Sequence, residues 1–160
     1  MRGFFFSGHP DGVLDALSGI MTAKNDMKTL VEEIYSVRGR GDIEGTLALL
    51  GEGCTFRMVG NARLAPLTIE SSGHDFRQTI TQLITAWDLS KVRTTGIYVD
   101  EDEQMVFAHR EGEVRHIPSG ITFSTEFVDN IHFQDGKPVK IVEFVDTLQV
   151  AETSRMIQIA

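Results

Sequence analysis

Apolar residues recur at helical spacing in the first half of the chain, and three segments follow this pattern. Residues 25–42 form the first predicted helix, which Asn25 or Asp26 caps and two glycines end. A shorter helix begins after its cap residue, Asp42. The clearest helix covers residues 73–90, and its apolar stripe consists of Phe76, Ile80, Leu83, Ile84 and Trp87.

In the second half of the chain, apolar residues alternate with polar ones, which is typical of β-strands. Four segments form two predicted hairpins: residues 91–102 with 103–116, and residues 121–133 with 137–148. The second hairpin turns at Asp135-Gly136, a pair that favours a tight turn. A short strand at 54–60 precedes the third helix. Helices followed by consecutive antiparallel strands predict an α+β fold, with the helices on one face of a curved sheet.

The pattern divides the chain into an extension (1–26), one domain (27–150) and a tail (151–160). The extension holds a run of three phenylalanines, too short for a secretion signal. We expect it to pack on the surface or against a second subunit. The alternative is that translation starts at Met21 or Met27. The tail is expected to form a short helix and an end strand.

Composition is that of an ordinary soluble domain: 160 residues, 41% hydrophobic and 24% charged. The net charge of -8 argues against a nucleic-acid partner. The single cysteine, Cys54, excludes an internal disulfide, and no Cys/His spacing resembles a zinc site. No apolar run reaches membrane-spanning length. We therefore expect a cytoplasmic protein that uses no metal and no cofactor.

One acidic residue interrupts the most apolar predicted strand, "VKIVEFVDTL". By strand alternation, Glu143 shares its face with Val139, Ile141 and Val145. An ionised carboxylate is costly to bury without a partner. Glu143 is therefore expected to be paired, to hold a proton or to face a wet pocket.

Three sequence segments in a fixed order resemble the NTF2-like superfamily, specifically its SnoaL-like and ketosteroid-isomerase-like branch. They are "IYSVRGRGDIEGTLALL", "SGHDF" and "HFQDGKPVKIVEFVD", and the resemblance covers residues 27 to 150. It implies a cone, in which a strongly curved antiparallel sheet wraps around about three helices and leaves an internal pocket. It also implies a homodimer formed through the outer face of the sheet. The superfamily includes isomerases, cyclases, epoxide hydrolases, dehydratases and non-catalytic proteins.

The resemblance assigns candidate roles to three residues. Glu143 occupies the place of a functional carboxylate in limonene-epoxide hydrolase and the phenazine-biosynthesis proteins. Asp129 matches the protonated aspartic acid of ketosteroid isomerases, and Tyr35 matches the tyrosine that completes their oxyanion hole. The structural alternatives are that Glu143 pairs with an arginine across the sheet and that the Tyr35 hydroxyl binds a backbone carbonyl.

The resemblance fails at one catalytic position. Arg57 stands where the isomerases carry their aspartate base, and an arginine cannot take a proton at working pH. Steroid isomerisation by that mechanism is therefore disfavoured. Arg57 would instead bind a substrate carboxylate or neutralise Glu143 or Asp129 across the cavity.

Further pocket residues are expected from the same comparison. His74 lies near the segment where phenazine-type members carry a histidine, and its alternative is an exposed first-turn residue. His109 lies where epoxide hydrolases place charged residues. Trp87 and Phe127 are expected to line the substrate site. Three other residues are expected outside the site: His116 and His132 on the surface, and Asp146 in a backbone contact at the end of the sheet.

Together these features predict a cofactor-independent acid–base enzyme of the isomerase, cyclase, dehydratase or hydratase type. Its substrate would be a small, mostly apolar organic molecule, and Glu143 would transfer the proton. The alternative is a non-catalytic ligand-binding or dimerisation module, which the arginine in place of the base favours. Catalysis requires Glu143 to face an open cavity with a raised pKa, whereas the alternative requires it to be locked against Arg57.

Overall fold

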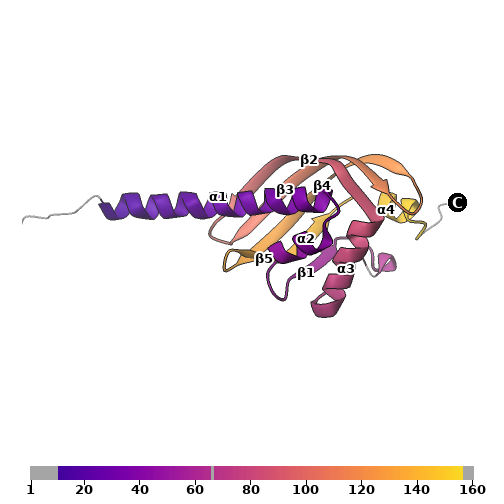
Figure 1. The fold of residues 1–160 in the computed structure, drawn as a ribbon, viewed down its shortest axis with the longest axis horizontal. Helices are drawn as coiled ribbons and strands as arrows, with labels where there is room; N and C mark the ends of the chain where they lie inside the picture. The colour runs from indigo at the N-terminus through magenta and orange to yellow at the C-terminus, as the bar shows by residue number, and fades with distance from the viewer. Residues whose placement is uncertain (1–10, 66, 157–160) are drawn as a thin grey trace, which may run out of the picture.

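The computed structural model describes residues 11–65 and 67–156, and it consists of one bent sheet with helices against its inner face (Figure 1). The elements in order are α1 (Asp11–Gly39), α2 (Ile43–Leu49), β1 (Thr55–Met58), the 3-10 helix η1 (Ala62–Leu64), α3 (Gly73–Ala86), β2 (Trp87–Asp100), β3 (Met105–His116), β4 (Thr122–Gln134), β5 (Lys137–Phe144) and α4 (Thr147–Thr153). The sheet order is β1-β5-β4-β3-β2, antiparallel except where β1 joins β5 in parallel. The α+β prediction is confirmed.

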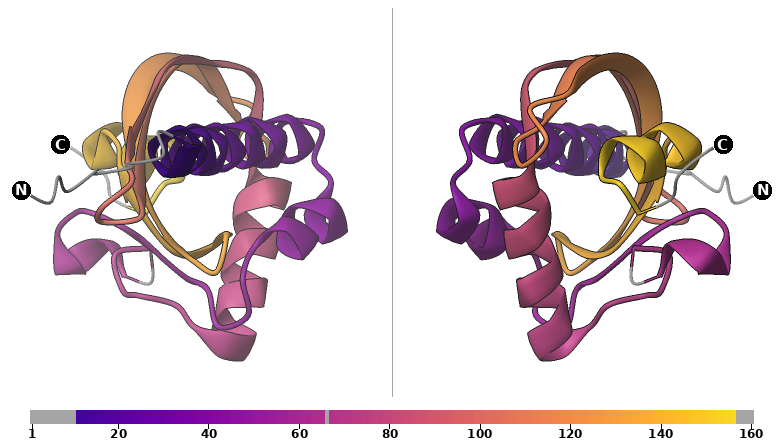
Figure 2. Two further views of the ribbon diagram at one scale, coloured as in Figure 1. Left: turned by 90° about the vertical axis from the view of Figure 1, so that its left-hand side faces the viewer. Right: turned by 90° about the vertical axis from the view of Figure 1, so that its right-hand side faces the viewer.

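The sheet curves strongly, and the end views show it arching over α1, with α2 and α3 on the side that the arch leaves open (Figure 2). Two register irregularities in β2 coincide with this curvature, since bulges bend a strand. Gly112 of β3 pairs with Val92, which lies between the two irregularities, and its φ is 152°. A Cβ there would approach the Lys91 carbonyl oxygen to 2.3 Å, so the bend requires glycine at this point.

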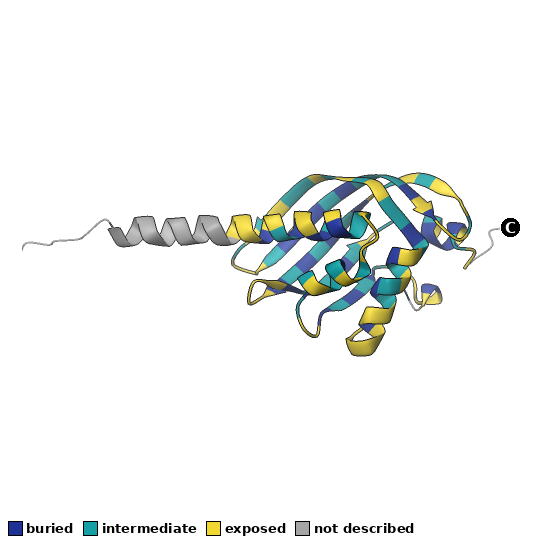
Figure 3. Ribbon diagram, in the orientation of Figure 1, coloured by how far each residue is buried: buried dark blue, intermediate teal, exposed yellow. Residues whose placement is uncertain are grey.

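Helix α1 is longer than the sequence predicts. It begins at Asp11, so the prediction that Asn25 or Asp26 caps it is wrong. Gly19 is the strongest helix-weakening residue in between, and it costs only about 1 kcal/mol in a helix interior. The last turns of α1 bury Val31 and Ile34 beneath the sheet (Figure 3). The helix continues beyond the sheet edge in the other direction (Figure 1).

The predicted cap at Asp42 and the hairpin turn at Asp135-Gly136 are confirmed. The Asp42 side chain accepts a hydrogen bond from the Gly45 amide at 2.8 Å and begins α2. Asp135 and Gly136 both have positive φ, which is the conformation of the tight turn between β4 and β5. The Asp146 carboxylate accepts from the Gln149 amide at 3.1 Å, so this residue has the structural role expected for it.

The junction between α3 and β2 differs from the sequence prediction. The helix ends at Ala86, four residues early, and Trp87 is the first residue of β2. Arg38 donates hydrogen bonds to the carbonyls of Leu83 and Trp87, each at 3.0 Å. These bonds tie the end of α3 to α1, and the Leu83 carbonyl also accepts from the backbone amide of Trp87. Of the predicted tail, the short helix is α4, while the end strand falls largely on residues outside the described ranges.

The apolar core consists of three clusters that share partly buried residues at their borders. One joins α1 and α2 to β1 and α3, a second joins α1 to β3 and β4, and a third lies around Trp87, Val114 and Val150. The sheet and helices do not fill all of the space between these clusters. A cavity remains there, lined by residues of the first and third clusters and by Tyr35 and Ile141, which pack against the second.

Candidate functional site

The cavity has a volume of about 120 Å³ and a mostly apolar wall. Apolar side chains from α1, α3, β1, β3 and β4 form most of it. Besides the hydroxyl-bearing Thr46 and Thr125, five residues bring a phenol or an ionisable group to the same wall: Tyr35, Arg38, Arg110, Asp129 and Glu143. Such a combination of apolar wall and few polar groups is the usual composition of a small-molecule site.

Three adjacent strands supply the charged groups. Arg110 lies on β3, Asp129 on β4 and Glu143 on β5, all on the inner face of the bent sheet. Asp129 and Glu143 are direct cross-strand partners. Side chains of such partners on one face are close enough to interact. The curvature therefore brings two carboxyl groups and a guanidinium to one wall of the cavity.

Asp129 has two partners that favour its ionised form. The Tyr35 hydroxyl donates a hydrogen bond of 2.6 Å to Oδ2 of Asp129, and Nη1 of Arg110 lies 3.8 Å from the same oxygen. Asp129 is only 3% exposed, and this burial raises its pKa. The hydrogen bond from Tyr35 and the charge of Arg110 act in the opposite direction. Burial also raises the pKa of Tyr35 well above 10.0, so the phenol keeps its proton and donates.

Glu143 is the group that holds a proton. Its side chain is partly buried in the cavity wall, and this burial, together with the negative charge of Asp129, raises its pKa to about 8. The positive charges of Arg110 and Arg38 oppose the increase without cancelling it. The negative charge of Asp129, its cross-strand neighbour, favours the protonated form of Glu143, whereas the Tyr35 hydroxyl and Arg110 favour the ionised form of Asp129. At neutral pH, Asp129 is therefore the carboxylate and Glu143 the carboxylic acid.

Aromatic rings position Arg110. Its guanidinium carbon lies 3.7 Å from the centre of the Tyr35 ring and 5.1 Å from that of Phe127. Both distances are in the range of cation–π attraction. Arg110 is 3% exposed, and Asp129 is the acid that faces it. The arginine therefore adds a fixed positive charge to the cavity wall.

Of the residues that the sequence predicts for the site, five lie on the cavity wall: Tyr35, Trp87, Phe127, Asp129 and Glu143. Tyr35 donates to a carboxylate instead of to the backbone carbonyl of the structural alternative. No arginine makes an ion pair with Glu143 in the described part of the chain, which is the other structural alternative.

Two residues that were expected to line the pocket lie on the opposite face of the sheet. Arg57 lies between Phe56 and Met58 on β1; these two line the cavity, so strand alternation turns Arg57 to the opposite face. The prediction that it neutralises the carboxylates is wrong. His109 also lies on the outer face, where its ring contacts Thr95 at 3.0 Å and Glu126 at 3.4 Å.

For two histidines, the observed burial is the reverse of the predicted one. His74 is exposed in the first turn of α3 and does not line the cavity, because the inward stripe of that helix begins at Phe76. His116 is buried, contrary to prediction, with its ring centre 4.5 Å from that of Trp87. Burial lowers the pKa of His116.

Sequence reasoning missed Arg110 and Arg38. Arg110 follows Val106 and Ala108 on one strand face, which is the same kind of signal that identified Glu143. Arg38 is four residues after Ile34 and continues the apolar stripe of α1. Burial lowers the pKa of Arg38 to about 10, so it remains charged at neutral pH.

Residues 11–65 and 67–156 contain no group of three or more His, Cys, Asp or Glu side chains arranged to hold a metal ion. Within the same ranges, no helix is both long and apolar enough to cross a membrane.

Comparison with known proteins identifies the fold. No family model and no curated protein matches the sequence. Solved structures do match: a proposed isomerase from Bacillus subtilis has a TM-score of 0.74 at 16% identity, covering 86% of this chain and 99% of its own. An NTF2-like protein of unknown function from Burkholderia pseudomallei has a TM-score of 0.66 at 17% identity, covering 80% and 96%. A proposed polyketide cyclase from Xanthomonas campestris has a TM-score of 0.64 at 15% identity, covering 82% and 98%. The chain therefore has the NTF2-like fold, in agreement with the resemblance found in its sequence.

Proposed function

We propose that the chain is a cofactor-independent acid–base enzyme that transfers a proton to the oxygen of a small organic molecule. The observation that carries this proposal is the position of Glu143, whose raised pKa keeps it protonated on the wall of a cavity. A carboxylic acid with a pKa near the working pH is well matched to general acid catalysis. Isomerisation, cyclisation and dehydration all use such a step.

The chemistry follows from the two carboxyl groups. Glu143 donates its proton to a carbonyl or hydroxyl oxygen of the bound molecule, and it becomes a carboxylate beside the carboxylate of Asp129. Two adjacent negative charges are unfavourable, so Glu143 readily takes a proton back. A proton from the carbon next to a carbonyl restores Glu143 and gives an enol, which is the first half of an isomerisation.

The neighbouring groups stabilise the doubly charged state. The Tyr35 hydroxyl remains bonded to Asp129, and the positive charges of Arg110 and Arg38 act on both carboxyl groups. These groups are held in place before the reaction, so no reorganisation is needed when the charge develops. Their contribution is electrostatic stabilisation of the state that follows proton donation.

Size and polarity limit the substrate class. An apolar cavity of about 150 Å³ holds benzene, so a cavity of about 120 Å³ suits a compact molecule of one ring. The apolar wall favours hydrocarbon, and the polar groups favour one or two oxygens on it. The names of two structural neighbours, a proposed isomerase and a proposed polyketide cyclase, support an enzyme on this fold without specifying a substrate of this size.

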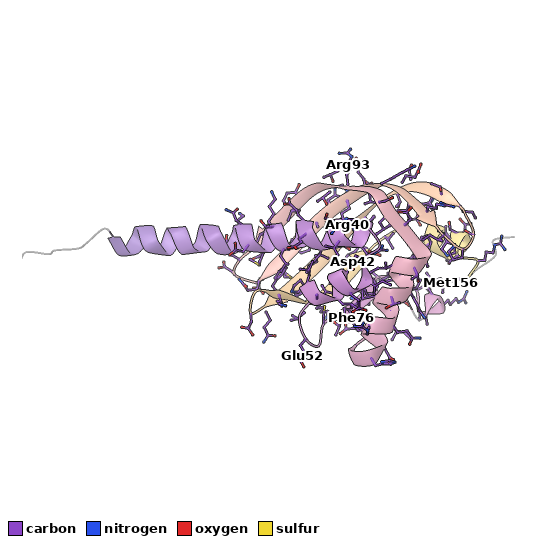
Figure 4. The ribbon with its side chains drawn as sticks, viewed as in Figure 1. Arg40, Asp42, Glu52, Phe76, Arg93 and Met156 are labelled. Atoms are coloured by element: carbon purple, nitrogen blue, oxygen red, sulfur yellow. The ribbon has the colours of Figure 1, made fainter. Side chains whose placement is uncertain are left out.

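The proposal is tested by hydrogen–deuterium exchange at the carbon next to the carbonyl of cyclohexanone, followed by proton NMR in heavy water. Wild-type protein should accelerate exchange over buffer, and Glu143→Gln should abolish the acceleration. Glu52→Gln is the matched control, because Glu52 is exposed on the loop between α2 and β1 (Figure 4). Equal exchange by wild type and Glu143→Gln would refute the role of Glu143.

The same experiment distinguishes the ligand-binding alternative. A protein that only binds would gain thermal stability with cyclohexanone, since a ligand that binds the folded state stabilises it. It would nevertheless leave the exchange rate at that of buffer. Absence of both effects would contradict the proposed preference for a compact ketone.

A further inference from the structure

The Arg110 guanidinium has unused hydrogen-bonding capacity. In the described part of the chain, no group accepts a hydrogen bond from it: Nε is buried without a partner, and Nη1 approaches Asp129 only to 3.8 Å. Guanidinium groups carry five N–H donors, and buried donors are normally satisfied. The Arg110 side chain is 3% exposed and lines the cavity. Its N–H donors point to an acceptor that the protein itself does not provide.

The other arginine of the cavity does not share this property. Arg38 donates to the carbonyls of Leu83 and Trp87, so its position is explained by the protein itself. Arg110 is instead fixed by contacts with the faces of Tyr35 and Phe127. Contacts of this kind hold the guanidinium in place without consuming its N–H groups.

The charges of the cavity wall do not balance. Arg38 of α1 and Arg110 of β3 are both positive, whereas Asp129 of β4 is negative and Glu143 of β5 holds a proton at neutral pH. Tyr35 of α1 is neutral. No other ionisable side chain lines the cavity within the described ranges. One positive charge in a largely apolar cavity is therefore left without a partner, which is costly.

We infer that the substrate of this cavity carries an anionic oxygen group, a carboxylate on a compact ring, which Arg110 binds. This inference rests on the proposed function of the cavity as a small-molecule site, and it adds the charge of the ligand. A carboxylate presents two acceptor oxygens to the planar fork of an arginine and neutralises the excess charge. The chain as a whole is negative, with net charge -8, so selection for an anion arises locally at Arg110.

Benzoate and benzamide test the inference, because they share shape and differ in charge. Titration calorimetry of the wild-type protein at neutral pH should give about tenfold or more tighter binding for benzoate, the usual effect of a charged hydrogen bond. Arg110→Met should reduce this preference to about twofold or less. Arg57→Met is the matched control and should keep the full preference, because Arg57 lies on the opposite face of the sheet.

Glu143 makes a second prediction that needs no variant. As pH rises through about 8, Glu143 ionises and cancels the excess positive charge, so benzoate should bind more weakly while benzamide changes little. Equal binding of benzoate and benzamide, or binding of neither, would overturn the inference. So would a benzoate preference that survives in Arg110→Met. None of these results affects the hydrogen–deuterium exchange of neutral cyclohexanone. That experiment therefore tests the proposed function independently of the inference.

Discussion

Replacing Glu143 with glutamine should change how the stability of the protein depends on pH. In the folded protein the pKa of Glu143 rises from 4.5 to about 8 because the group is buried beside Asp129. Between these values the folded state keeps a proton that the unfolded chain releases. The contribution of Glu143 to the free energy of unfolding is therefore fully present below about pH 4.5, and it is lost as the pH rises to about 8.

The size of the effect follows from the same numbers. A pKa difference of about 3.5 corresponds to about 5 kcal/mol, at about 1.4 kcal/mol for each pH unit. Glutamine keeps the shape of the protonated acid and cannot ionise. The free energy of unfolding of Glu143→Gln should therefore rise relative to wild type with pH, by up to about 5 kcal/mol at about pH 9.

Urea unfolding measured across this pH range provides the assay, and the single tryptophan, Trp87, is a buried fluorescent probe. The substitution also removes the Glu143 charge from beside Asp129, so the comparison reports on the pair of carboxyl groups. Glu52→Gln should differ from wild type by a small amount that does not grow with pH, since Glu52 is exposed. A stability difference for Glu143→Gln that is the same at about pH 5 and about pH 9 would refute a raised pKa.

Two other substitutions test the arrangement around this pair. Tyr35→Phe removes the hydroxyl that donates to buried Asp129 and should cost about 1–3 kcal/mol in urea unfolding, whereas Tyr98→Phe, 67% exposed, should cost almost nothing. Equal costs would mean that the 2.6 Å bond is not stabilising. Gly112→Ala places a Cβ 2.3 Å from a backbone oxygen of β2 and should cost about 3 kcal/mol or more. A thermal midpoint within about 2 °C of wild type would show that the bend does not require this glycine.

The elements that local chemistry dictates could be predicted from the sequence. Asp42 and Asp135-Gly136 specify a cap and a turn through their own backbone interactions, and both lie where expected. Alternation along a strand groups Glu143 with Ile141 and Val145, and all three line the cavity, whereas Asp129 is identified by the family resemblance. The parallel pairing of β1 with β5 has no local signal, since it joins segments about 85 residues apart through backbone bonds.

The errors at the site have two physical causes. In "TFRM", alternation favours Phe56 and Met58 on the inner face, and the prediction for Arg57 followed a family position against that pattern. Around His109 the pattern is ambiguous, because Met105, Val106, Phe107 and Ala108 make both faces of the strand apolar. In the tertiary structure, the face of β3 that carries Arg110 is the inward one, and His109 lies on the other face.

The predicted ends of α1 and α3 are wrong because hydrophobic periodicity does not specify where a helix begins or ends. Trp87 fits the apolar stripe of α3 at the next helical position, yet the chain has already become a strand there. The contact that accompanies this change is long-range: Arg38, from α1, binds carbonyls at the junction. A sequence pattern within one segment contains no information about such a partner.

The central claim is that Glu143 holds a proton at neutral pH while it faces the cavity. Carbon-13 NMR of the glutamate carboxyl groups measures this directly, with the Glu143 signal assigned by its loss in Glu143→Gln. The account predicts a titration midpoint at about 8 for this signal. A midpoint at or below 4.5, the ordinary value for glutamate, would contradict it.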